Sequence, residues 1–89
     1  MRQKLFQVED CLYSVSGKLV LAAKVDDNVA NFKQGDFIIL VKPDGTEIKA
    51  QARGGGKFKV LNSLVQSILL EEELKKEDIP IGTIIFLNI

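Results

Sequence analysis

Histidine and tryptophan are absent from the 89-residue sequence, and it holds a single cysteine, Cys11. Without histidine, the chain has no imidazole base to activate a serine or cysteine nucleophile, so Ser-His and Cys-His catalysis are excluded. One cysteine forms neither a disulfide within the chain nor a thiolate cage for a metal. Cys11 lies among apolar residues, which favours a small core side chain over a nucleophile. The composition therefore predicts a protein that is not an enzyme and has no metal site and no cofactor.

An excess of charge of one sign is also missing, because 12 Lys and Arg residues face 12 Asp and Glu residues. No global field draws such a chain to nucleic acid or to an anionic membrane, so binding of that kind needs a local patch. A hydrophobic content of 46% with 27% charged residues is typical of one folded domain, here residues 1–89. No apolar run has the length of a signal peptide or a membrane span, which predicts a cytoplasmic protein without membrane contact.

Short apolar runs separated by turn residues cover the first half of the chain. Residues 4–13 alternate loosely, and residues 18–25 form a Val- and Leu-rich run of strand length. Residues 37–41 are a largely β-branched run that favours a strand. Pro43-Asp44-Gly45 then precedes residues 46–52, which alternate polar and apolar side chains. This pattern predicts a hairpin around the Pro-Asp-Gly turn.

Residues 62–80 fit two structures. Apolar residues at helical spacing and Glu–Lys pairs four residues apart favour a helix. The alternative is a strand at about residues 65–70, then a short helical turn or loop near 74–79, and a last strand over 83–87. The whole pattern of short strands and turns predicts an all-β fold, a small six- to seven-stranded antiparallel β-barrel.

Residues 53–59 read RGGGKFK and have two interpretations. The segment turns a corner between strands as a flexible loop, with glycines at positive φ and solvated lysines. Alternatively, the glycine N–H groups form an anion-binding nest, and the phenylalanine stacks on a base. We expect the corner, and the segment is also the best candidate for an anion contact. The candidate nucleic-acid or anion-binding residues are Arg53, Gly54, Gly55, Gly56, Lys57, Phe58 and Lys59.

The charge is unevenly distributed along the chain. Residues 42–59 contain five cations and two anions, whereas residues 71–78 contain five anions and two cations. Adjacent carboxylates on a strand point to alternate faces, so Glu71-Glu72-Glu73 is predicted to be a solvated charge run and not a metal cage. The segment GGGKF is no P-loop, because Gln51 stands at the first glycine position and Phe58 at the hydroxyl position. Nucleotide hydrolysis is therefore excluded.

Three stretches in order, FQVEDCLYSVSGKLVLAAKV (6–25), FKQGDFIILV (32–41) and LKKEDIPIGTII (74–85), share a pattern with a known family. They resemble the opening hairpin, the next strand and the closing element of the β-barrel that is domain 2 of translational GTPases such as elongation factor Tu. The resemblance spans most of the chain. Residues 53–59 match nothing in the family pattern, and these 89 residues hold no counterpart of its GTPase domain.

The resemblance implies a place for Glu9, Asp10 and Leu12 beside the pocket that takes the aminoacyl end of tRNA in elongation factor Tu. The simpler interpretation is that Glu9-Asp10 ends a strand at the barrel rim and keeps an edge from aggregating. The resemblance also implies a non-catalytic binding module for RNA, a ribonucleoprotein or a translation-related protein. The alternative is a protein inhibitor or adaptor of the immunity type, acting through a protein–protein interface. The sequence leaves the oligomeric state open.

Overall fold

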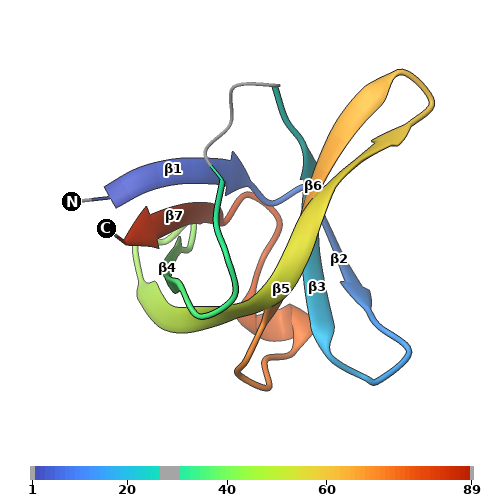
Figure 1. Cartoon of the computed structure of the whole chain (residues 1–89). Helices are drawn as coiled ribbons and strands as arrows, with labels where there is room; N and C mark the ends of the chain where they lie inside the picture. Colours follow the sequence, from blue (N-terminus) through green and yellow to red (C-terminus); the bar gives the residue numbers. More distant parts are fainter. Residues whose placement is uncertain (1, 27–30, 89) are drawn as a thin grey trace.

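The computed structural model describes residues 2–26 and 31–88 (Figure 1). In these residues, seven antiparallel strands form one sheet in the order β1-β7-β4-β5-β6-β3-β2. The elements are β1 (Arg2–Gln7), β2 (Asp10–Tyr13), β3 (Leu19–Lys24), β4 (Phe37–Val41), β5 (Glu47–Val60), β6 (Ser63–Leu70), the 3-10 turn η1 (Lys76–Asp78) and β7 (Ile84–Asn88). Within the described ranges, no helix is long and apolar enough to cross a membrane.

The two outermost strands of the sheet, β1 and β2, are consecutive in the chain. Between them, the Val8 N–H donates to the Thr83 carbonyl at 2.7 Å and the Glu9 N–H donates to the Ala22 carbonyl at 3.1 Å. The chain thus leaves β7 and joins β3 without a break, and β1 and β2 act as one bent strand (Figure 1). The sheet curls into a small barrel, so the predicted all-β fold is confirmed.

Alternating side chains of the strands fill a single core. In β3, Leu19, Leu21 and Ala23 point inward, and in β6, Ile68 and Leu70 do the same. Burying a large aliphatic side chain stabilises the fold by about 1.5–3 kcal/mol, so these positions dominate its stability. The buried apolar side chains that form the core are Leu5, Phe6, Val8, Cys11, Leu19, Leu21, Ala23, Ile38, Leu40, Ala50, Ala52, Ile68, Leu70, Ile79 and Ile85.

Residues 62–80 adopt the strand alternative, and the helical one is wrong. β6 buries every second residue from Gln66 to Leu70, which is the period of a strand. It pairs with β3 on one side and β5 on the other, and these two ladders outweigh the helical spacing of its apolar residues. The chain then makes the 3-10 turn η1, inside the predicted range of 74–79.

The predicted hairpin around residues 43–45 joins β4 and β5. Gly45 has a φ of 91°, the left-handed conformation that glycine allows. The Lys42 N–H donates to the Thr46 carbonyl at 2.8 Å and closes the turn. The Asp44 carboxylate accepts hydrogen bonds from the N–H and the hydroxyl of Thr46, which lower the pKa of Asp44. These local contacts fix the register of the two strands.

Residues 53–59 lie inside β5, so the prediction of a loop that turns a corner between strands is wrong. The first part of this 14-residue strand pairs with β4, and the part from Ala52 to Val60 pairs with β6. A bulge between Ala52 and Gly54 marks the change of partner. A bulge bends a strand and increases its twist. The strand itself therefore crosses from one side of the barrel to the other, and the glycines are part of its ladder (Figure 1).

Candidate binding groove

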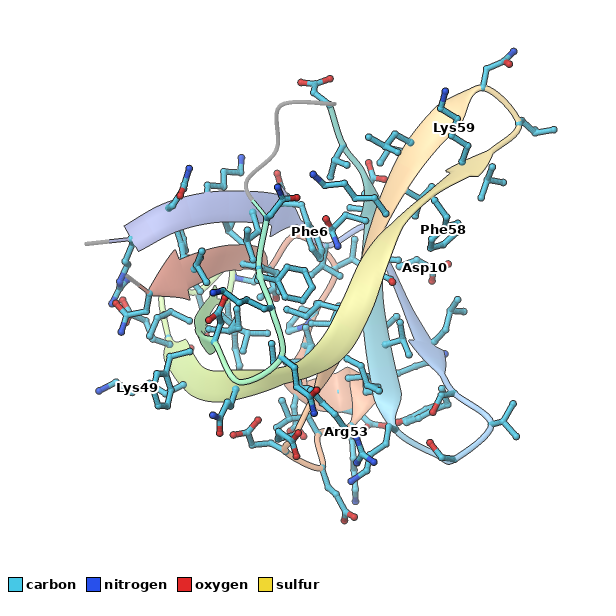
Figure 2. The ribbon with its side chains drawn as sticks, in the orientation of Figure 1. Phe6, Asp10, Lys49, Arg53, Phe58 and Lys59 are labelled. Carbon is cyan, nitrogen blue, oxygen red and sulfur yellow. The ribbon has the colours of Figure 1, made fainter. Side chains whose placement is uncertain are left out.

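The three cations of residues 53–59 do not form one cluster, because Arg53 lies apart from Lys57 and Lys59 along β5. Arg53 and Lys59 are six residues apart, or about 20 Å in an extended strand, and Figure 2 shows them far apart along β5. The Lys57 ammonium donates to Asn31 Oδ1 at 2.8 Å. Because neighbouring side chains of a strand point to opposite faces, Phe58 faces away from Lys57 and Lys59. The aromatic ring and the two lysines therefore lie on opposite sides of β5.

The three glycines stand opposite β6, in the order Gly54–Leu69, Gly55–Ile68 and Gly56–Ser67. An anion nest needs successive N–H groups on one side of the chain. In a strand, successive N–H groups point to alternate sides, so these glycines present a ladder and not a nest.

A glycine is required at position 55, whereas positions 54 and 56 have room for a side chain. Its φ is 142°, and an added Cβ would lie 2.3 Å from the Ser67 carbonyl oxygen and 2.9 Å from the Phe32 ring. A Cβ at Gly54 or Gly56 would meet nothing within 4 Å. The backbone thus approaches β6 and Phe32 closely at Gly55, and the outer face of β5 is open at the other two positions.

An apolar groove of about 410 Å³ lies on the outer face of β2, β3, β6 and β5. Glu9, Asp10 and Leu12 line this groove together with Phe58, so it joins residues from two candidate sites that the sequence analysis treats as separate. Figure 2 shows Phe58 and Asp10 on the same side of the barrel. The other lining residues are Ala22, Ala23, Lys24, Val60 and Val65.

The register of the strands arranges the outward side chains in rows across this face. From β5 outward, the rows are Phe58–Val65–Lys24, Gly56–Ser67–Ala22–Asp10 and Gly54–Leu69–Val20–Leu12. Leu12 and Phe58 are 52% and 48% exposed, and Val60, which follows Phe58 on the same face, is 48% exposed. Exposed apolar side chains therefore lie at the β5 side of the face, with Phe58 and Val60, and at the β2 side, with Leu12. No side chain covers the backbone of β5 at Gly54 and Gly56.

Sequence reasoning did not find Val60, Val65 and Ala22 as parts of a site. For Val60 and Val65, the signal is the apolar side chains of β5 and β6 beyond the point where the core ends, whereas Ala22 lies between two core residues of β3 and gives no such signal. The side chains of Phe58 and Val60 do not contribute to the core, because they lie past Ala52, the last buried residue of β5.

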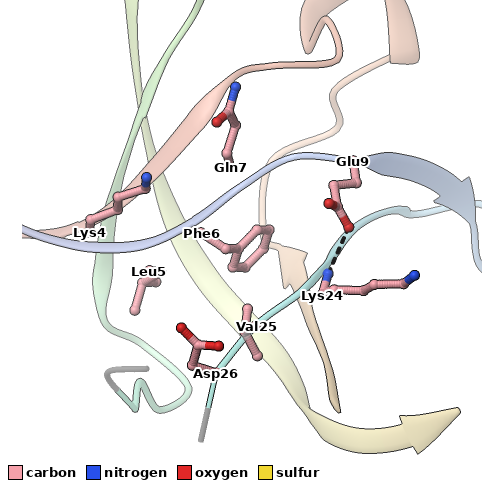
Figure 3. Close-up of a pocket in the computed structure, with 8 residues that line it drawn as sticks. All are labelled: Lys4, Leu5, Phe6, Gln7, Glu9, Lys24, Val25 and Asp26. Carbon is pink, nitrogen blue, oxygen red and sulfur yellow. Dashed lines mark hydrogen bonds between the residues drawn. The ribbon is translucent and has the colours of Figure 1, made fainter. Parts of the chain in front are cut away.

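The two carboxylates at the rim of the groove also hold the backbone. Glu9 Oε1 accepts a hydrogen bond from the Lys24 N–H at 2.8 Å, which ties the β1–β2 junction to β3 (Figure 3). Asp10 Oδ1 accepts from the Cys11 N–H at 2.9 Å. Cys11 belongs to the outermost strand β2, so the Asp10 contact agrees with the interpretation of Glu9-Asp10 as edge protection, whereas Lys24 belongs to the interior strand β3. Both residues therefore line the groove, and each also accepts a hydrogen bond from a backbone N–H.

A second hollow, of about 320 Å³, lies between β1 and the end of β3 (Figure 3). Its floor includes the core residues Leu5 and Phe6, and charges of both signs surround it. The lining residues are Lys4, Leu5, Phe6, Gln7, Glu9, Lys24, Val25 and Asp26. Opposite charges at one rim largely cancel, so this hollow selects no ligand by charge.

Cys11 is a core side chain, as predicted. It is buried, and its Sγ donates to the Ile79 carbonyl at 3.7 Å. Burial raises the pKa of the Cys11 thiol, and the neighbouring carboxylate of Asp10 adds to this effect. The protonated thiol is a poor nucleophile, because the thiolate is the reactive form.

The acidic segment 71–78 lies at the barrel surface. Glu72 Oε1 accepts from the Gln51 N–H at 3.1 Å, and Glu73 lies 3.6 Å from the Lys18 ammonium. Residues 2–26 and 31–88 hold no group of three His, Cys, Asp or Glu side chains placed to bind a metal ion.

Comparison of the chain with protein-family models, with curated proteins and with solved structures found no match. The groove and its residues therefore carry the functional argument.

Proposed function

We propose that the protein is a non-catalytic binding module that binds another protein on the outer face of β2, β3, β6 and β5. The groove on this face carries the proposal, because it places the half-exposed side chains of Leu12, Phe58 and Val60 on one surface. The centres of protein interfaces are depleted in charge and enriched in aromatic residues, and a few buried anchors supply most of the affinity. In this proposal Phe58 is the main anchor, at the β5 side of the groove.

The charges around the groove favour a protein over RNA. Nucleic-acid binding depends on cations that neutralise several phosphates. The groove is lined by one cation, Lys24, and by two anions, Glu9 and Asp10. Arg53 and Lys59 are separated along β5, so neither adds to a common phosphate site. RNA remains the competing ligand, with the ring of Phe58 as a surface on which a base would stack.

The rim would give the contact its orientation. Burial of the apolar floor supplies affinity without direction, whereas charges at the edge of an interface favour one docking pose and disfavour others. Such a module would act as an adaptor or inhibitor that covers a partner's surface. The resemblance to domain 2 of translational GTPases supports a translation-related protein as the partner.

Capture from a lysate of the organism that encodes the protein tests the proposal. The purified chain is immobilised at about 0.05 M and about 0.3 M salt, a range over which phosphate-driven binding falls steeply, with and without ribonuclease. The groove variant is Leu12→Ser/Phe58→Ser, and its matched control is Arg53→Ser/Lys59→Ser. We expect the wild type and the control to retain the same protein at both salt concentrations and after ribonuclease, and the groove variant to lose it.

Two outcomes would contradict the proposal. RNA-dependent capture that disappears at the higher salt concentration, and also in the Arg53→Ser/Lys59→Ser control, would favour the RNA-binding hypothesis. Capture that is unchanged in the Leu12→Ser/Phe58→Ser variant would show that the partner binds elsewhere on the barrel.

A further inference from the structure

The two sides of the groove differ in charge. At the β5 side, the lining residues are Phe58 and Val60, whose side chains are apolar. At the β2 side, Leu12 is accompanied by the carboxylates of Glu9 and Asp10, where the chain enters β2. A ligand that spans the groove therefore meets apolar side chains at one side and negative charge at the other.

The middle of the groove is low and has room for a strand-like ligand. Ala22 lies there on β3, in register with Asp10 of β2, and it carries only a methyl group. β6 and β3 separate β5 from β2, so three strand spacings of about 4.8 Å make the groove about 14 Å across. An extended segment of about four residues spans that distance.

The carboxylates at the β2 side are not neutralised by the fold. In residues 2–26 and 31–88, neither Glu9 nor Asp10 forms an ion pair with a cation, and neither does Lys24. Glu9 and Asp10 each accept a backbone N–H with one oxygen, which leaves the second oxygen of each to another donor. Asp10 and Lys24 are diagonal neighbours, about 7–8 Å apart. Two carboxylates and one ammonium give the groove a net charge of −1.

A lysine or arginine side chain is complementary to the β2 side. Its charged group donates to the remaining carboxylate oxygens of Glu9 and Asp10, while its methylene stem packs on Leu12. A nucleic acid or an acidic peptide would bring further negative charge to the same place, which the two carboxylates disfavour. The groove is therefore suited to a ligand that is apolar at one end and basic at the other.

We propose that the groove binds an extended segment of about four residues, with apolar side chains at the β5 side and a lysine or arginine at the β2 side. The segment belongs to the partner protein, so this inference rests on the proposed function. It gives the chemistry by which the partner is recognised. Phe58 and Val60 supply apolar contact, and Glu9 and Asp10 set the direction in which the segment lies.

NMR titration of the isotope-labelled full chain with two synthetic peptides tests this chemistry. The probes are acetyl-Phe-Leu-Ala-Lys-amide and acetyl-Phe-Leu-Ala-Glu-amide, which differ only in the last side chain. Each is added to about 5 mM, a concentration that detects weak binding. We expect the lysine peptide to shift the backbone signals of the groove residues and to bind about tenfold more tightly than the glutamate peptide.

Three variants locate the effect. Asp10→Asn keeps an acceptor for the Cys11 N–H and removes the charge, so the preference for the lysine peptide should fall below about threefold. Asp36→Asn is the matched control and should keep the wild-type preference. The Asp36 carboxylate also accepts a backbone N–H, from Lys33, but lies outside the groove. Ala22→Leu fills the middle of the groove and should abolish binding of both peptides without lowering the melting temperature.

Three outcomes would overturn the inference: equal binding of the two peptides, no binding of the lysine peptide at about 5 mM, or an unchanged preference in Asp10→Asn. The failures of the two proposals are distinguishable. If capture depends on Leu12 and Phe58 but the peptides bind equally or not at all, the inference is wrong and the binding module stands. If the lysine peptide binds as expected but capture is unchanged in Leu12→Ser/Phe58→Ser, the chemistry of the groove stands and the proposed function is wrong.

Discussion

The two halves of β5 share one backbone but differ in what their side chains do. In the first half, Ala50 and Ala52 are buried in the core, and the strand forms part of the barrel wall beside β4. From Arg53 to Val60 no side chain is buried, and the strand pairs with β6. The bulge at Arg53 divides the two halves. One strand thus serves first as scaffold and then as an arm that presents the groove.

The second half of β5 therefore contributes no buried side chain to the core. The first half is held by its ladder with β4 and by the burial of Ala50 and Ala52 in the core. The second half is held by its ladder with β6, in which Gly55 approaches the backbone of β6 closely. Substitutions in β5 separate these two ways of holding a strand.

The largest effect is expected for Gly55→Ala. A Cβ at this position meets the Ser67 carbonyl oxygen, and the φ of 142° is in a region nearly restricted to glycine. Backbone strain and overpacking together should cost about 3 kcal/mol. That is a large part of the about 5–10 kcal/mol expected for a domain of this size. Unfolding in urea, followed by circular dichroism, measures the loss.

Gly56→Ala is the matched control for that experiment. Its Cβ meets no atom within 4 Å, and its φ lies outside the positive region. We expect a change of less than about 1 kcal/mol, on the stabilising side, because alanine restricts the unfolded chain more than glycine. Equal losses in the two variants would show that the close approach at Gly55 does not hold the second half of β5.

The contrast within β5 also explains which part of the fold is predictable from the sequence. The hairpin around Gly45 and the strands over 18–25 and 37–41 were predicted, because alternation and turn residues are local signals. The sequence of residues 53–59 predicts a loop, because consecutive glycines are unfavourable in an isolated strand. The structure overrides that preference, since β6 and Phe32 leave room only for a glycine at position 55.

The groove was predictable only in pieces. Glu9, Asp10 and Leu12 were singled out by the resemblance to translation factors, and Phe58 by its place between two lysines. That they line one groove depends on β6 lying between β3 and β5 in a fixed register. Register across non-neighbouring strands is not encoded in any local pattern, so the sequence alone gave two separate candidates.

A smaller effect, of opposite sign, is expected at the end of the second half of β5. Leu61→Gly relieves the positive φ of the hairpin tip, although glycine also adds freedom to the unfolded chain. The net gain in stability should be about 0.5–1 kcal/mol. Urea unfolding of the wild type and the variant measures the difference.

Val15→Gly provides the control at another exposed hairpin residue. Val15 does not have a positive φ, so glycine relieves no strain there and should lower the stability by up to about 1 kcal/mol. A loss of stability in both variants would contradict the claim that the backbone of Leu61 is strained.

The smallest effect is expected at the start of the first half. Arg2 donates two hydrogen bonds to Glu47, at 2.6 and 3.0 Å, across the surface between β1 and β5. These bonds lower the pKa of Glu47 below its ordinary value. A lowered folded-state pKa adds stability above the unfolded-state pKa of about 4.3, and this gain is lost as the pH falls through the folded-state value.

Glu47→Gln should therefore lower the melting temperature slightly at neutral pH and leave it unchanged in acid, where the wild-type carboxylate is protonated as well. Both side chains are partly exposed, so the difference should also shrink as salt screens the pair. Calorimetry of the two chains from about pH 7 to about pH 2, spanning the ordinary range of a glutamate pKa, measures the difference. Asp44 titrates in both chains and cancels in the comparison. A difference that grows as the pH falls would mean that Arg2 does not stabilise the charged form of Glu47.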